Sequence, residues 1–344
     1  MTLPSSAPAA IRALTPPPSD AEADAWRDVL AAVQAADLPQ LPPPSRVEVS
    51  GRIQAAPTRG RAALWAAEAG AAGAAGDGAA RDRAAGMLGV AGLLLFSDEG
   101  NRHTAFLDVL AVRPGARRQG HGTALWQRVR EALLADGRSS VSAVVDLGGP
   151  GQAFAESLGF TEALRMAWYV QDVTAPGPEQ VPLPPGYTLP CWPGLVPDAW
   201  AEAAATAHGA MEDAPSGETD ELIETWTAGR LHAAQQLILD RGGAITTVAA
   251  ATPQGEVAAY TELVLPDPDG PRAIQYDTVV VPGHRGRGLG RAVKLRMLAE
   301  AAARHPALRT IATTVADDNA PMRAVNETLG YRRERAAAVF QLKL

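Results

Sequence analysis

The chain has 344 residues, of which 47% are hydrophobic and 20% are charged, a composition that can bury sizeable cores and excludes a disordered polyampholyte. Lys and Arg number 31 against 38 Asp and Glu, and the resulting net charge of −7 argues against binding to nucleic-acid backbones or anionic membranes. The single cysteine, Cys191, excludes an internal disulfide, and the six histidines form no HxxxH pair, so no metal site is expected.

At roughly 150 residues per domain, the length predicts two domains. The sequence has no run of about 18 uncharged apolar residues. Its Pro-rich first twenty residues also lack the basic and then apolar order of a signal peptide. We therefore expect a cytoplasmic protein.

The first half is predicted to begin with a helix at 20–36, because Ser19 and Glu22 form an S-x-x-E capping box. A second helix follows Gly122, where Leu125, Val129 and Leu133 recur at helical spacing. The low-complexity segment 66–86 is expected to be a long hairpin loop. Strands are predicted at 61–67, 87–96, 104–113, 141–146 and 160–171, with a short helix before the last.

The second half shows a similar order of elements. A helix again follows a glycine-rich turn, with Val293 and Met297 in the register of Leu125 and Val129. Further helices are predicted at 198–210, at 220–237 and from about 320, and strands at 244–251, 256–264, 272–281, 309–315 and 331–343. Each half is therefore expected to be a mixed α+β unit.

The similarity of the halves extends to a sequence repeat. Residues 111–125 read AVRPGARRQGHGTAL and residues 279–293 read VVVPGHRGRGLGRAV. Arg285 lies 168 residues after Arg117, and Tyr331 lies 171 residues after Phe160 in a shared Leu-Gly-aromatic motif. Two landmarks at nearly one offset indicate a duplicated domain.

A Pro-rich segment separates the two copies. Its sequence, VTAPGPEQVPLPPG at 173–186, disfavours helix and predicts an extended linker. The expected domains are therefore 1–172 and 187–344, joined by residues 173–186.

The glycine turn before the helix of the second copy can bind an anion. Glycines let the backbone approach a ligand, and the free N–H groups and dipole of a helix start favour a diphosphate. The alternative of a plain structural turn with solvated arginines is weakened by the second copy. A Rossmann dinucleotide site is disfavoured, because these glycines follow three strands and are spaced G-x-G-x-G.

The pattern V-x-P-x-x-R-x-x-G-x-G, followed by N-x-x-M-x-x-x-N-x-x-L-G-Y at 319–331, resembles the GCN5-related N-acetyltransferases (GNAT). The resemblance covers the core of each half and is stronger in the second. It implies two tandem GNAT domains, each a mostly antiparallel mixed sheet flanked by helices. It also implies acetyl-CoA as donor, without a metal.

The resemblance implies cofactor-binding residues at matching positions. Val279 and Val281 would offer main-chain groups to pantetheine, and Asn319 would bond the same arm, act as an N-cap, or do both. Residues around the diphosphate would be Arg285, Gly286, Arg287, Gly288, Gly290 and Arg291. The corresponding turn of the first copy, which can also hold a CoA, contains Arg117, Arg118, Gly120 and Gly122.

The second copy is the expected catalytic one, since the first has Gly148 where Asn319 stands. The implied reaction is direct attack of an amine on the thioester, which requires a base and a proton for the departing thiolate. Glu262 and Asp277 are polar residues in apolar strands and are candidates for the base or for a structural bond.

The acid is left open, because many family members carry a tyrosine where this chain has Asn326. Tyr331, Tyr260 or a water would then supply the proton. Acidic residues between the two helices predicted at 198–210 and 220–237 are expected to favour a helix N-terminus or to form a cation-selecting entrance for an amine. They are Glu212, Asp213, Glu218, Asp220, Glu221 and Glu224.

The expected function is thus acetyl transfer from acetyl-CoA to a small-molecule or peptide amine by a monomer or homodimer. No nucleic acid and no membrane is expected as a partner. Two alternatives remain: an acyltransferase using another acyl-CoA or a non-amine acceptor, and a non-catalytic acyl-CoA-binding or sensing module.

Overall fold

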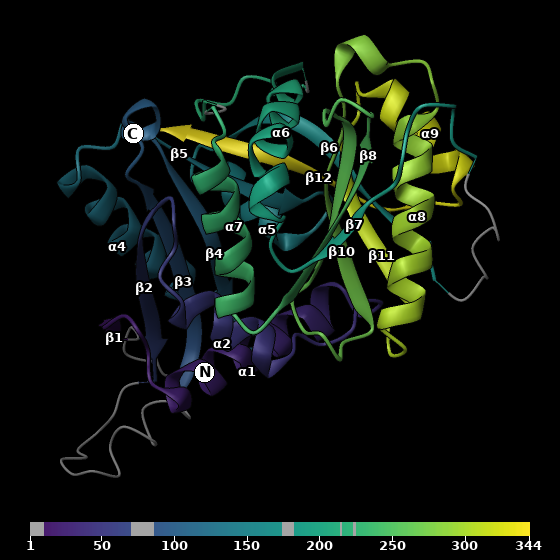
Figure 1. Cartoon of the computed structure of the whole chain (residues 1–344). Helices are drawn as coiled ribbons and strands as arrows, with labels where there is room; N and C mark the ends of the chain where they lie inside the picture. The colour runs from purple at the N-terminus through teal and green to yellow at the C-terminus, as the bar shows by residue number, and fades with distance from the viewer. Residues whose placement is uncertain (1–9, 70–85, 174–181, 214, 223–224) are drawn as a thin grey trace, which may run out of the picture. The chain divides into compact units, whose positions relative to one another are not determined.

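The computed structural model describes residues 10–69, 86–173, 182–213, 215–222 and 225–344 (Figure 1). The chain divides into two compact units. Unit 1 comprises Met1–Ala163, Thr219–Leu222 and Val339–Leu344, and unit 2 comprises Leu164–Glu218 and Ile223–Ala338. Within the described ranges, no helix has both the length and the apolar character needed to cross a membrane.

Unit 1 has a mixed sheet with strand order β1-β2-β3-β4-β5, antiparallel except for the parallel pair β4 and β5. A Cβ on Gly92 would meet Trp26 of α1, and one on Gly89 would meet Leu125 of α4. These helices therefore pack on opposite faces. The elements are β1 (Ala10–Leu14), α1 (Asp20–Asp37), α2 (Arg46–Gln54), β2 (Gly60–Glu68), β3 (Met87–Phe96), β4 (Ala105–Val112), α4 (His121–Ala135), β5 (Ser140–Asp146) and α5 (Pro150–Ser157).

The predicted elements of the first half are present. The Ser19 capping box forms, with the Glu22 carboxylate accepting from the Ser19 backbone N–H at 2.9 Å. Two elements, β1 and α2, were not expected. The predicted loop at 66–86 was wrong at its start, because Ala66 and Ala67 are fully buried within β2, which continues to Glu68. Residues 70–85 of that loop lie outside the described residues.

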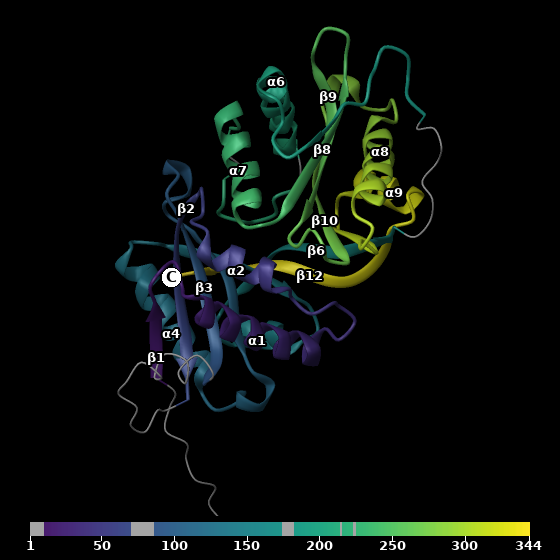
Figure 2. The same ribbon diagram turned by 60° about the horizontal axis from the view of Figure 1, so that its bottom comes forward.

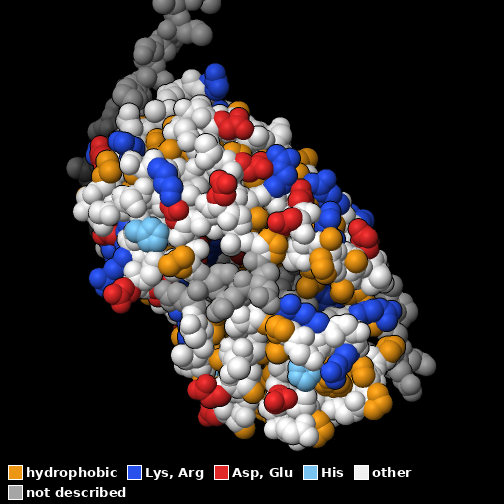
Figure 3. Space-filling model, turned by 90° about the horizontal axis from the view of Figure 1, so that it is seen from above, with side chains coloured by type: hydrophobic (Ala, Val, Ile, Leu, Met, Phe, Trp, Pro, Cys, Tyr) orange, Lys and Arg blue, Asp and Glu red, His pale blue; other side chains and the backbone are white. Residues whose placement is uncertain are grey.

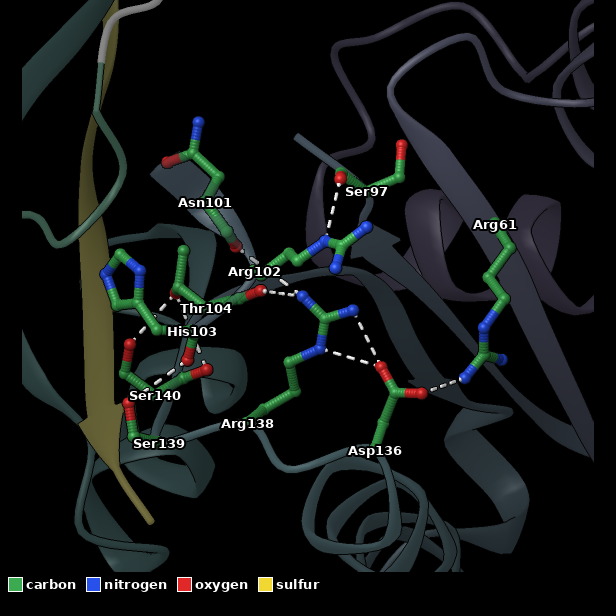
Figure 4. A network of polar contacts seen from close by, with 10 residues as sticks. All are labelled: Arg61, Ser97, Asn101, Arg102, His103, Thr104, Asp136, Arg138, Ser139 and Ser140. Atoms are coloured by element: carbon green, nitrogen blue, oxygen red, sulfur yellow. Dashed lines mark hydrogen bonds and ion pairs between the residues drawn. The ribbon is translucent and has the colours of Figure 1, made fainter. Parts of the chain in front are cut away.

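A buried arginine joins two loops of unit 1 (Figure 4). Arg138 follows α4, and its guanidinium donates to the Thr104 carbonyl at 2.9 Å and to the Asp136 carboxylate at 2.8 Å. The same carboxylate pairs with Arg61 from β2. Arg138 is only 8% exposed, so these partners take the place of water. The bonds fix the turn that carries Asn101.

Replacing Arg138 with Met should lower the free energy of unfolding of unit 1 by about 2–4 kcal/mol, because the buried Thr104 carbonyl loses its donor and Asp136 loses a counter-charge. Urea unfolding followed by circular dichroism measures the change. Arg128→Met is the matched control. It removes an exposed pair with Glu131 and should cost under about 0.5 kcal/mol. Equal losses in the two variants would contradict the role given to Arg138.

Asn101 holds a segment from the second half of the sequence. Its side-chain amide donates to the Leu222 carbonyl at 3.1 Å, and its carbonyl oxygen accepts from the Leu222 N–H at 2.8 Å. Asn101 is fully buried. This reciprocal pair explains why Thr219–Leu222 belongs to unit 1.

The acidic residues of this segment are paired with bases of unit 1. Glu221 forms an ion pair with Arg59 at 2.7 Å, and Asp220 pairs with Lys343. The prediction that a helix begins at 220 was wrong, because the helix begins at Ala228. Asp220 and Glu221 are therefore neither helix N-terminal acids nor free carboxylates. Glu224 lies outside the described residues.

Unit 2 has the strand order β12-β6-β11-β10-β9-β8-β7. Helices α6 and α7 lie on one face of this sheet, and α8 and α9 lie on the other (Figure 2). The elements are β6 (Thr161–Asp172), β7 (Cys191–Pro193), α6 (Asp198–His208), α7 (Ala228–Asp240), β8 (Ala244–Ala251), β9 (Val257–Leu265), β10 (Arg272–Val280), α8 (Leu289–Arg304), β11 (Thr310–Ala316), α9 (Ala320–Thr328) and β12 (Arg332–Lys343).

The strand predicted to end the first copy, β6, enters unit 2 from Leu164 onwards. It pairs antiparallel with the whole of β11, from Met166 opposite Ala316 to Asp172 opposite Thr310. Of the predicted linker 173–186, residues 174–181 lie outside the described residues.

Strands β10 and β11 separate within the sheet. They pair in parallel over Arg272–Ile274, after which β10 follows β9 and β11 follows β6. A bulge in β10 begins at the same place, where Tyr276 and Asp277 together oppose Glu262 of β9. The extra residue bends the strand and re-aims its side chains. Because the strands separate, main-chain groups at the end of β10 do not pair with β11.

Candidate active site

The glycine turn of unit 2 connects β10 to α8. Gly286 and Gly288 have φ of +76° and +77°, in the left-handed region that favours glycine. Gly288 is also the N-cap of α8, and no side-chain cap is found there among the described residues. The first N–H groups of α8 are therefore available to an anion, as the sequence predicts.

Gly290 lies inside the first turn of α8 and is buried. A Cβ at this position would come within 3.2 Å of Val280 Cγ2 at the end of β10. Its absence allows the helix to pack closely on the strand. Gly122 holds the corresponding place in α4, where a Cβ would lie 3.3 Å from Phe154.

One arginine at the same position of each glycine turn holds the turn to the strand before it. Arg285 Nε donates to the Val280 carbonyl at 3.1 Å, and Arg117 Nε donates to the Val112 carbonyl at 3.1 Å. The Arg117 terminal nitrogens also form a bidentate pair with Asp37 at 2.8 and 2.6 Å. This bond to Asp37 raises the pKa of Arg117. The Asp37 carboxylate thus neutralises Arg117, whose charge was predicted to lie beside a diphosphate.

The turn of the first copy is otherwise similar but more strained. Gly120 is the N-cap of α4 at φ +86°. Arg118 takes φ +64°, at the position that Gly286 holds in the second copy. A non-glycine residue in this region costs about 1–2 kcal/mol. The second turn is thus the better adapted of the two for close approach of a ligand.

Two other arginines of the second turn differ in their surroundings. Arg287 donates to the Tyr187 hydroxyl at 2.9 Å and to the Gly283 carbonyl at 3.3 Å, which holds it against the turn. Arg291 is exposed in the first turn of α8. Both guanidinium groups remain beside the helix N-terminus, where positive charge adds to the dipole.

The other residues predicted to bind acetyl-CoA lie on β10 or just after β10 and β11, where these two strands separate. Val279 is buried in β10, and Val281 follows the strand. Asn319 is the N-cap of α9, where its Oδ1 accepts from the Met322 N–H at 3.2 Å. The N-cap role predicted for Asn319 is confirmed, and a bond from its Nδ2 to pantetheine stays a prediction.

A cluster of titratable side chains lies on the opposite face, beside α6 and α7. His208, the last residue of α6, contacts the Asp277 carboxylate through Nε2 at 3.0 Å. Its ring stacks on Trp226 with centroids 3.8 Å apart and an angle of 22°. His208 is 5% exposed, and its Nδ1 has no partner within the part of the chain that the structure describes.

Glu262 and Tyr260 of β9 complete the cluster. Glu262 Oε1 accepts from Gln235 at 2.9 Å and from Thr247 at 3.3 Å. Burial raises the pKa of Glu262 to about 6, with Asp277 adding to the rise. The Tyr260 ring lies 6.1 Å from that of His208, and burial raises the pKa of Tyr260 well above its usual value. The Tyr260 hydroxyl is also buried without a partner in the described ranges.

Tyr331 belongs to a different network on the α8 face of the sheet. Its hydroxyl donates to Gln275 Oε1, which also accepts from Lys294 Nζ at 2.9 Å. Lys294 Nζ donates to Asn326 Oδ1 at 2.7 Å as well. Burial lowers the pKa of Lys294 to about 7 and raises that of Tyr331. Asn326, at the position of the absent tyrosine, thus serves as a buried acceptor.

The structure therefore brings three of the four catalytic candidates together and separates the fourth. Tyr260, Glu262 and Asp277 face α6 and α7, whereas Tyr331 lies with Lys294 on the other side of the sheet. His208 and Lys294 were missed by the sequence reasoning. For Lys294 a signal existed, since a lysine stands in the helical stripe of Gly290, Met297 and Ala301.

Charges are mixed on the surface seen in Figure 3. Basic and acidic side chains alternate there and do not gather into one patch of a single sign. The arginines of the glycine turn are thus a local feature of an acidic chain.

The parted strands, the uncapped glycine turn and the paired motifs define an acyltransferase fold. The model of the Acetyltransferase (GNAT) family matches residues 56–160 and 211–331, so the chain belongs to the GNAT family, with one match in each half. Among curated proteins, a mycothiol acetyltransferase of Salinispora tropica is 30% identical over 238 residues, which cover 68% of this chain and 72% of the relative.

A mycothiol acetyltransferase of Thermomonospora curvata is 28% identical, over 67% of this chain and 72% of the relative. Among solved structures, a tandem GNAT protein from the clavulanic acid biosynthesis pathway has a TM-score of 0.78 at 26% identity, covering 97% of this chain and 98% of that one. A GCN5-related N-acetyltransferase from Sphaerobacter thermophilus has a TM-score of 0.67 at 17% identity, over 99% and 97% of the two chains. The tandem GNAT fold predicted from the sequence is confirmed.

Proposed function

We propose that the protein transfers an acetyl group from acetyl-CoA to the amine of a small molecule or peptide, by direct attack in a ternary complex. The active site is assigned to the second copy, residues 187–344. One observation carries this assignment: the uncapped glycine turn and the parting of β10 and β11 lie in the same unit as the buried side chains of His208, Glu262 and Tyr260 and the partly exposed carboxylate of Asp277.

The donor side is supported by the chemistry of the turn. The diphosphate of CoA would lie at the N–H groups that start α8, beside Arg287 and Arg291. Main-chain groups of Val279 and Val281 would bond pantetheine where β10 leaves β11. In the first copy, Arg117 is neutralised by Asp37 and Arg118 is strained, which favours the second turn.

The acceptor side is supported by carboxylates that can take up a proton. An alkylamine is protonated at neutral pH and must lose a proton before it attacks. Glu262, with a pKa raised to about 6, and Asp277 lie beside each other on β9 and β10. Tyr331 lies on the other face of the sheet, which leaves Tyr260 or a water as the proton source for the thiolate.

A binding module that holds an acyl-CoA without turnover is the second candidate. The buried Asn326 favours it, because an amide cannot deliver a proton to the leaving thiolate. An acyltransferase with another acyl-CoA or a non-amine acceptor remains within the same fold. Because two relatives are mycothiol acetyltransferases, the acceptor amine of those enzymes is one to include in any screen.

The proposal is tested by following free thiol release from acetyl-CoA over a library of amines, alongside thermal shift with CoA. The expected result is a CoA-dependent rise in the melting temperature and turnover with at least one amine. Stabilisation by CoA without turnover on any acceptor would identify a binding module. No stabilisation by CoA would overturn the donor assignment.

A further inference from the structure

The hydrogen bond between His208 and Asp277 determines the tautomer of the imidazole. Carboxylate oxygens accept hydrogen bonds, so the ring nitrogen 3.0 Å from Asp277 Oδ2, which is Nε2, carries a proton. In the neutral ring the other nitrogen, Nδ1, is then a lone-pair acceptor. Nδ1 is therefore the basic atom of His208.

Nδ1 is a buried acceptor that requires a polar partner. It is buried and has no hydrogen-bond partner in the described ranges. Such atoms are uncommon, because burial without a partner costs about 1–3 kcal/mol. The Tyr260 hydroxyl is in the same condition, and its ring centroid lies 6.1 Å from that of His208. Two unpartnered polar atoms of one cluster indicate a place for a polar group of a ligand.

Two side chains hold the imidazole in place. Asp277 binds it from the bulge of β10, and Trp226, ahead of α7, stacks on its face. The Arg230 guanidinium lies 5.8 Å from the Trp226 ring. Among the residues that the structure describes, the charged or titratable groups that face His208 are Asp277 from β10, Tyr260 and Glu262 from β9, and Arg230 beyond Trp226.

We propose that His208 is the catalytic base of the second unit, receiving the proton of the acceptor amine at Nδ1, with Asp277 and Trp226 as positioning residues. The proposal rests on the proposed acetyltransferase function. His208 takes the place of Asp277 as the group that removes the proton, because the Asp277 carboxylate accepts a hydrogen bond from His208 Nε2. His208 also takes the place of Glu262, whose Oε1 accepts two hydrogen bonds from Gln235 and Thr247.

Acetyl transfer from acetyl-CoA to a protonated amine releases one proton in all. His208 Nδ1 takes one proton from the ammonium, and the freed lone pair forms a bond to the thioester carbon. The C–S bond breaks, and the sulfur leaves with its electron pair as a thiolate. The second proton lost by nitrogen reaches sulfur through water. The products are an amide, the free thiol of CoA and one proton that the imidazolium returns to solvent.

The decisive variant is His208→Gln, whose amide can still donate to Asp277 but has no basic nitrogen. With acetyl-CoA and an amine turned over by the wild type, kcat should fall about 10²–10⁴-fold, the range attributed to a positioned base. Thermal stabilisation by CoA should be unchanged. His305→Gln, in the C-cap of α8, is the matched control and should retain wild-type kcat.

Asp277→Asn provides a second test through the pH profile of kcat/KM. This profile should not shift if His208 has only a structural role. Asparagine can accept from Nε2 and keep the tautomer, but the imidazolium loses its counter-charge. We expect a smaller fall in kcat, and the acidic limb of the pH profile of kcat/KM should move to lower pH. This test holds even if His208→Gln proves unstable.

The outcomes separate this inference from the proposed function. Normal kcat in His208→Gln, or an unchanged acidic limb in Asp277→Asn, would overturn the role of His208 while the acetyltransferase stands. Loss of the acidic limb in Glu262→Gln, with the limb retained in His208→Gln, would assign the base to Glu262. Absence of turnover by the wild type with any acceptor would instead refute the proposed function, and the base assignment with it.

Discussion

A Gly288→Glu variant should lose CoA binding by the second unit, with affinity reduced at least about a hundredfold, which corresponds to about 2.7 kcal/mol. Gly288 caps α8 at φ +77°, and a Cβ there would meet no heavy atom within 4 Å. The added carboxylate therefore does not clash with the protein. It occupies the helix N-terminus and repels the diphosphate that we place there.

Two further variants separate the effect of charge from that of backbone strain and show which unit binds CoA. Gly288→Ala introduces the backbone strain of an L-residue at positive φ, about 1–2 kcal/mol, but no charge, so it should retain most CoA binding. Gly120→Glu makes the same change in the first copy and should leave CoA binding by the second unit intact. Isothermal titration of CoA measures all three. If Gly120→Glu abolishes binding and Gly288→Glu does not, the first unit holds the cofactor and our assignment is wrong.

The buried Lys294 should make the protein more stable as the pH rises from about 7 to about 10. Burial lowers the pKa of Lys294 to about 7, whereas the unfolded chain titrates near the ordinary value of 10.5. Between these values the unfolded chain holds a proton that the folded chain has released. The free energy of unfolding therefore rises with pH, by at most about 1.4 kcal/mol per pH unit.

Lys294→Met should remove this pH dependence, although Asn326 Oδ1 then loses its donor at every pH. Urea unfolding of wild type and variant at pH 7.5 and 9.0 compares the two slopes. Groups that the substitution leaves unchanged contribute alike to both slopes. The only other lysine, Lys343, lies at the exposed end of β12, and Lys343→Met should keep the wild-type slope. Equal slopes for wild type and Lys294→Met would contradict an unusually acidic lysine.

Features encoded by local sequence were predictable. The bounds of β3 and β8 equal the predicted strands 87–96 and 244–251. The continuous apolar run of β3 marks a strand that is buried on both faces, and β8 is buried over Ile245–Ala251 although it contains Thr246 and Thr247. The glycine turn was predictable for a similar reason, since φ above zero requires glycine at particular positions.

Features that depend on distant partners were not predictable. The acids at 220–221 look like the start of a helix, but Asn101, 121 residues before Leu222, holds that segment in a different unit. His208 reads as the polar end of an apolar helix. Its chemistry comes from Asp277, 69 residues later, and from a bulge that has no sequence signature.

The route of β6 has a consequence for dividing the chain into its two copies. A cut within 173–186 would remove from unit 2 the strand that pairs with all seven residues of β11. It would also remove Thr219–Leu222 and Val339–Leu344 from unit 1. The two copies have thus ceased to be interchangeable modules. A single copy separated at this boundary would carry an unsatisfied sheet edge with it.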